Sequence, residues 1–264
     1  MRRWLLALLC LVALQAEAGH SCEDQPLTVE QIARGMALAE QTAKALDASG
    51  AEVVVLARAG QDLREYGLQW SHLGFAYRDT DAVGQPVWRV LHKLNICATD
   101  HAGLYRQGLG QFFLDRPFRY EAAFEVPTPQ LQQALLPLLR DNARAAALDE
   151  PRYSMVAYSW GTKYQQSNQW AVETLAATQA GVYNRAQAQA QAWLRAQGYQ
   201  PTDLHLSTFK RLGADVAMAN VAFDDHPNAR RFTGHIETTT VDSVFAWLPR
   251  AGYASTVQRI ELQP

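Results

Sequence analysis

Two strand-like segments joined by a turn-rich loop constrain the fold of this chain most strongly. Residues 72–77 alternate in hydropathy, and residues 87–92 form a second strand-like run. The loop between them, residues 79–86, contains Asp, Gly and Pro, which are typical of turns. This pattern predicts an antiparallel hairpin. Because the first strand carries His72 and the second carries His92, we expect the two imidazoles to approach each other across it.

The rest of the chain mixes helical and strand-like patterns. A capping box at residues 28–31 opens an amphipathic helix that Gly50 ends. Further expected elements are a buried strand at 53–56, a strand at 119–126, a helix opened by Thr128-Pro129, a helix at 169–177, a helix from the capping pattern at 184–187 to Gly198, and short strands across 204–245. The predicted fold class is therefore α+β.

The N-terminal segment has the features of a secretory signal peptide. Arg2 and Arg3 precede an apolar run from Trp4 to Leu14, and Ala16-Glu17-Ala18 places small residues before a cleavage point. A retained membrane anchor is the alternative, but the run is shorter than the roughly 18 to 20 residues that a spanning helix needs. We expect a signal peptide at 1–18, a single α+β domain at 19–264, and a secreted, periplasmic protein with no integral membrane segment after cleavage.

Cysteine usage fits an oxidising compartment. The three cysteines are Cys10, Cys22 and Cys97, and the first would leave with the signal peptide. The remaining pair predicts a Cys22–Cys97 disulfide, because lone pairs of thiols usually bridge in secreted proteins. The alternative is that Cys97 is a catalytic thiol.

Charge and motifs exclude several classes of partner. The net charge of −2 gives no broad attraction for nucleic acid. Gly108-Leu109-Gly110 follows no predicted strand and lacks a following Lys-Ser or Lys-Thr, so no phosphate loop or cofactor is predicted. Asp224-Asp225-His226 offers metal-ligand types, but its consecutive spacing before Pro227 favours a turn, and we predict no metal site.

Polar residues far apart in the chain could form a catalytic site. A nucleophile needs a base within reach and a polar group that orients the base. Ser167, at the start of a predicted helix, would gain from the free backbone N–H groups there. Ser167 could equally be a helix N-cap, and His72 and His92 could be structural histidines.

The order of these residues resembles that of circularly permuted papain-like peptidases and acyltransferases of the NlpC kind. The resemblance rests on His72-Leu73-Gly74-Phe75 on one strand, a polar residue on the next, and a helix start far downstream. It implies a papain-like core with an antiparallel sheet packed against helices. It also implies His72 as general base, His92 as its orienting partner and Ser167 at the nucleophile position, where those enzymes use cysteine.

A second resemblance covers the whole mature chain. It is to an uncharacterised bacterial secreted family, domain of unknown function 2145, which has no assigned activity. The strings that carry it are Tyr66-Gly67, Ser71 to Asp79, Gly108 to Phe113, Arg152 to Tyr158, Ser167 to Trp170 and Asn220 to Pro227.

Two functions remain open at this point. The first is a hydrolase or acyltransferase acting on amide or ester bonds of cell-envelope material. The second is a non-catalytic periplasmic binding protein on a degenerate papain-like scaffold, which the serine in place of cysteine favours. The aromatic residues between Tyr153 and Trp170 could line a groove for an envelope peptide or glycan, or could belong to the core.

Overall fold

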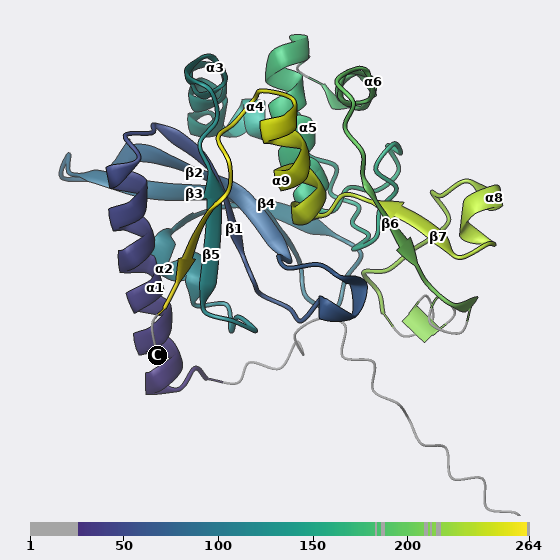
Figure 1. Cartoon of the computed structure of the whole chain (residues 1–264), viewed down its shortest axis with the longest axis horizontal. Coiled ribbons are helices and arrows are strands. Elements are labelled where there is room, and N and C mark those ends of the chain that lie inside the picture. Colours follow the sequence, from purple (N-terminus) through teal and green to yellow (C-terminus); the bar gives the residue numbers. More distant parts are fainter. Residues whose placement is uncertain are drawn as a thin grey trace, which may run out of the picture.

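A six-stranded sheet forms the centre of the molecule (Figure 1). The computed structural model describes residues 26–182, 184–185, 188–208, 211, 213–214 and 218–262. The strand order is β4-β3-β2-β1-β5-β8, and every neighbouring pair is antiparallel. The strands are β1 Val53–Arg58, β2 His72–Thr80, β3 Pro86–Asn95, β4 Ala102–Gly108, β5 Glu121–Glu125 and β8 Gln258–Glu261.

The hairpin predicted from the sequence is β2 and β3. Its register pairs Thr80 with Pro86 and Phe75 with Leu91. The connecting turn is held by Asp81, whose Oδ1 accepts hydrogen bonds from the backbone N–H groups of Val83 at 2.9 Å and Gln85 at 2.8 Å. A short polar side chain that bonds its own turn in this way explains why the sequence signal was strong.

One face of the sheet is covered by α1 (Val29–Ala48) and α2 (Leu109–Phe113). The predicted capping box is present, because Thr28 Oγ1 accepts from Gln31 N at 3.1 Å and Gln31 Oε1 accepts from Thr28 N at 2.9 Å. The core on this face includes Leu38 and Leu46 of α1 and Phe112 of α2.

Helices α3 to α6 and α9 pack around the other face (Figure 1). Their bounds are α3 Pro129–Arg140, α4 Asn142–Ala146, α5 Ser167–Ala180, α6 Gln189–Ala196 and α9 Val241–Arg250. Helix α5 is buried from Ser167 to Ala177 with no exposed side, and Trp170 packs on Phe75 of β2 with ring centroids 6.0 Å apart. A helix that is enclosed on all sides carries no amphipathic pattern, so its sequence shows only its capping signals.

A two-stranded ribbon lies beside this layered body (Figure 1). It consists of β6 (Thr202–His205) and β7 (His235–Thr238), with α8 (Asn228–Arg231) before β7. An isolated bridge between Tyr158 and Thr238 joins the ribbon to the loop before α5, and a short 3₁₀ helix, η1 (Arg64–Tyr66), precedes β2.

The structure confirms a mixed α/β fold with an antiparallel sheet and helices, and it corrects several element predictions. Residues 241–250 are helix α9 rather than a strand, because Thr240 and Ser243 form a capping box. Helix α5 begins at Ser167 and its N-cap is Gln166, so the N-cap role considered for Ser167 is wrong. Gly108-Leu109-Gly110 does follow a strand, β4, which has little alternation of its own and forms by pairing with β3.

None of the helices within the described residues is both long and apolar enough to cross a membrane. The predicted signal peptide at 1–18 lies outside the described residues.

Candidate functional site

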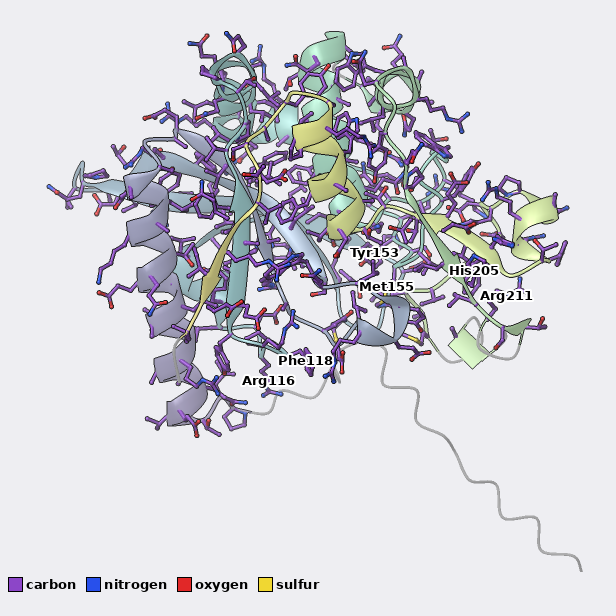
Figure 2. All side chains as sticks on the ribbon, in the orientation of Figure 1. Arg116, Phe118, Tyr153, Met155, His205 and Arg211 are labelled. Atoms are coloured by element: carbon purple, nitrogen blue, oxygen red, sulfur yellow. The ribbon has the colours of Figure 1, made fainter. Side chains whose placement is uncertain are left out.

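A cavity of about 800 Å³ opens where the sheet, the start of α5 and the β6–β7 ribbon meet. Figure 2 labels Tyr153 and Met155 in the region between the sheet and the ribbon, and both residues line the cavity. Other lining residues come from strands, loops and helix starts and include Arg58, His72, Ser167, Asn168 and Thr239. This volume suits a small-molecule or short-peptide ligand.

A hydrogen-bonded chain of three side chains ends at the cavity wall. His72 Nε2 lies 2.8 Å from His92 Nδ1, and His92 Nε2 lies 3.0 Å from Gln107 Oε1. The three residues lie on the neighbouring strands β2, β3 and β4. His92 is fully buried, whereas His72 lines the cavity and is 8% exposed. The predicted approach of the two imidazoles across the hairpin is therefore confirmed.

Gly74 makes this approach of the two strands possible. A Cβ atom at residue 74 would lie 2.7 Å from His92 Cβ and 3.0 Å from the backbone oxygen of Leu91, both too close. The glycine therefore leaves the space that the His92 side chain needs next to β2.

The half-buried Gln107, at the end of the chain away from the cavity, defines the tautomers. Gln107 Oε1 accepts, so the proton of neutral His92 is on Nε2 and its Nδ1 is an acceptor. His72 Nε2 then donates to His92, which leaves His72 Nδ1 with a free lone pair. In this arrangement His72 can accept a proton or a hydrogen bond from another group.

Burial and a nearby cation keep both imidazoles neutral. The pKa of His72 is held well below its usual value by burial first, and then by the charges of Arg58 and His92. Burial, followed by the charge of Arg58, lowers the pKa of His92 to about 3. Arg58 is itself 4% exposed and forms an ion pair with Asp115. At neutral pH both histidines are therefore uncharged.

Ser167 lines the same cavity from the first turn of α5. Burial raises the pKa of Tyr153, and a side-chain hydrogen bond between Ser167 and Tyr153 opposes this rise. Among the described residues, no hydrogen bond joins Ser167 to His72 or to His92.

The histidines and the α5 start approach β2 from different faces of the sheet. His72 and His92 pack on Phe112 of α2, with ring centroids 6.0 and 5.2 Å apart. Helix α5 lies on the opposite face, and Asn168 Oδ1 reaches the edge of β2 to accept from the backbone N–H of Leu73 at 3.1 Å. The structure thus brings His72 and His92 together. Ser167 lines the same cavity, but it approaches from the opposite face of the sheet, beyond the end of β2.

The remaining sequence-based sites have clear positions. Asp225 and His226 lie in a turn, as predicted; Asp225 Oδ2 accepts from Tyr158 N at 2.8 Å and its Oδ1 lies 2.9 Å from His226 Nδ1. This buried pair fixes the loop before α5. Cys97 lines the cavity, but Cys22 lies outside the described residues, so the disulfide stays a prediction.

Sequence reasoning missed Gln107 and the Arg58–Asp115 ion pair. Gln107 lies on β4, a strand that the sequence pattern did not predict. Arg58 ends the apolar run of β1 and is buried there. An arginine at the end of a continuous apolar run is the sequence signal that could have identified it.

Comparison with known proteins identifies one family. No curated protein and no solved structure matched the chain. The family model described as "Uncharacterized protein conserved in bacteria (DUF2145)" matches residues 45–248, a range that contains His72, His92 and Ser167. The chain therefore belongs to this family of conserved bacterial proteins.

Proposed function

We propose that this protein is a hydrolase or acyltransferase that acts on amide or ester bonds of cell-envelope material, on a papain-like core and after export to the periplasm. The observation that carries the proposal is the chain from Gln107 through His92 to His72, which ends at the cavity wall. A base oriented by a second polar group is the arrangement that nucleophilic catalysis needs. The order of strand histidine, second polar residue and helix start along the chain supports the papain-like part of the proposal.

In the proposed reaction Ser167 is the nucleophile and His72 the general base. Ser167 turns away from Tyr153 and transfers its proton to His72 Nδ1 as its Oγ attacks the carbonyl carbon. The leaving amine or alcohol takes that proton. Water or a second acceptor then attacks the acyl carbon, its proton passes through His72 to Ser167 Oγ, and the acyl group leaves the serine. Backbone N–H groups in the first turn of α5, other than that of Asn168, which donates to Gln166 Oε1 at 3.0 Å, would stabilise the negative charge on the carbonyl oxygen.

A substitution series tests this proposal on the purified protein with p-nitrophenyl esters and envelope stem peptides. His72→Ala is expected to lower kcat/KM by about 10²- to 10⁴-fold, the range for loss of a general base, and Ser167→Ala by at least as much, because it removes the nucleophile. His101→Ala is the matched control, because His101 is exposed and bonded to its neighbour Asp100 at 2.7 Å. Unchanged turnover in both site variants, or no labelling of Ser167 by a fluorophosphonate, would contradict the proposal.

A non-catalytic binding protein is the second candidate. It is favoured by the bond between Ser167 and Tyr153 and by the lowered pKa of His72, since an imidazole that resists protonation is a weak base. Ser167→Cys separates the two functions. Gain of thiol-dependent hydrolysis would show that the rest of the machinery is present, whereas ligand binding without hydrolysis in either form would support the binding protein.

A further inference from the structure

The β6–β7 ribbon carries three metal-ligating side chains on one of its faces. Asp203 and His205 are two residues apart in β6, so both project to the same side of the strand. The register pairs His205 directly with His235 of β7. Figure 2 labels His205 on the ribbon, away from the sheet that holds the histidine pair.

The three side chains are close enough to share one ion. His235 Nδ1 lies 2.8 Å from Asp203 Oδ2, and His205 Nε2 lies 4.0 Å from the same oxygen. The two imidazole rings are 4.3 Å apart between centroids. One ligand atom from each residue lies within 4.8 Å of the other two.

We propose that Asp203, His205 and His235 bind one divalent transition-metal ion of the zinc class. Two imidazoles and a carboxylate are ligand types that zinc accepts, at distances of about 2.0 to 2.2 Å. Small side-chain rotations bring the three ligand atoms onto such a sphere. Because Asp203 and His205 are exposed, an ion can reach them from solvent and water can complete the coordination.

Arg230 is the local competitor for this ion. Its Nη1 lies 3.6 Å from Asp203 Oδ2 and 3.4 Å from Glu237 Oε2. A bound cation would repel the guanidinium, which can remain paired with Glu237. Removing the charge of Arg230 should therefore strengthen metal binding at this site. Metal binding by a surface histidine elsewhere would not respond to this change.

The site would also act on the cavity, because the ribbon forms part of its wall. Leu204, which lies between Asp203 and His205 in β6, and Thr238, at the other end of β7 from His235, both line the cavity. An ion held by both strands at the His205–His235 end of the ladder would fix the two strands relative to each other. Metal binding is thus expected to stiffen one wall of the cavity whatever ligand the cavity takes.

Titration of the full chain with ZnCl₂, followed by calorimetry and by competition with a chromophoric chelator, tests the proposal. The wild type should bind one equivalent at this site. His205→Ala and His235→Ala should each weaken it at least tenfold, Arg230→Met should strengthen it severalfold, and His101→Ala should leave it unchanged.

Thermal unfolding gives a second readout. Zinc should raise the Tm of the wild type and of His101→Ala, but not that of the His205→Ala/His235→Ala double variant. Wild-type zinc affinity in the double variant, or no zinc uptake by the wild type at millimolar metal, would overturn the proposal. Neither result bears on hydrolysis at the cavity, since His72, His92 and Ser167 are unchanged in every protein.

Discussion

At the scale of single residues, Gly74 leaves the least room for an added Cβ atom among the described glycines. Gly74→Ala would place a Cβ against His92 Cβ at 2.7 Å and against the Leu91 oxygen at 3.0 Å, in a sheet that cannot widen locally without losing β2–β3 hydrogen bonds. We expect it to lower the free energy of unfolding by about 1 to 3 kcal/mol, the usual range for overpacking. Urea denaturation measures this difference.

The matched control is Gly103→Ala in β4. A Cβ atom there would meet only a Tyr105 ring carbon at 3.7 Å, an ordinary contact. We expect a change within about 0.5 kcal/mol, as for most surface substitutions. Equal stability of Gly74→Ala and Gly103→Ala would show that the strand spacing at His92 is not tight.

At the scale of elements, helix α5 is anchored by a buried charge rather than by an amphipathic face. Glu173 is 1% exposed and accepts from Arg185 Nε at 2.7 Å, from Gln165 at 2.6 Å and from Gln191 of α6 at 2.7 Å. These bonds join α5 to the loop before it and to α6. The interior therefore tolerates the burial of Glu173 because its carboxyl group is paired with these donors.

Glu173→Gln should lower the free energy of unfolding by about 3 to 5 kcal/mol, because it leaves the buried Arg185 without its counter-charge. Glu40→Gln is the control, since its ion pair with Lys44 is exposed to solvent and its loss should leave stability nearly unchanged. Chemical denaturation of both variants provides the comparison. A small effect of Glu173→Gln would mean that the surrounding amides alone satisfy Arg185.

At the scale of the whole molecule, buried titratable groups set how stability depends on pH. Burial raises the pKa of Glu125 to about 9, and both of its carboxyl oxygens are buried without a hydrogen-bond partner among the described residues. The unfolded chain releases this proton near pH 4.3, whereas the native protein keeps it up to its own pKa. Stability is therefore lost as pH rises between these two values. His72 and His92 contribute the opposite pH dependence, because their lowered pKa values reduce stability only as the pH falls below about 6.5.

Of these three groups, only Glu125 should therefore change its contribution to stability above pH 6.5. We expect the free energy of unfolding of the wild type to fall from pH 7 to pH 9. The free energy of unfolding of Glu125→Gln relative to that of the wild type should rise by at least about 1 kcal/mol over the same range, since one pKa unit corresponds to about 1.4 kcal/mol. Denaturation series at both pH values measure it, and a pH-independent difference between the two proteins would show that Glu125 is ionised in the native state.

The sequence alone was sufficient to predict the elements that are stabilised by bonds between residues close together in the chain. The capping box at Thr28, the hairpin turn at Asp81 and the Pro129 helix start were predicted because each is stabilised by bonds within a few residues. The approach of His72 and His92 followed in the same way, since a short hairpin fixes which residues face each other.

Tertiary structure decided the rest. Strand β4 has little alternation of its own and forms by pairing with β3, and the complete burial of α5 follows from its packing between elements distant in the chain. The same holds for the sites: Gln107 joins His92 only through β4, and His235 meets Asp203 only through the β6–β7 register. The side of the sheet from which Ser167 reaches the cavity was likewise settled by the packing of α5, because a linear pattern does not encode which face of a sheet a later helix will cover.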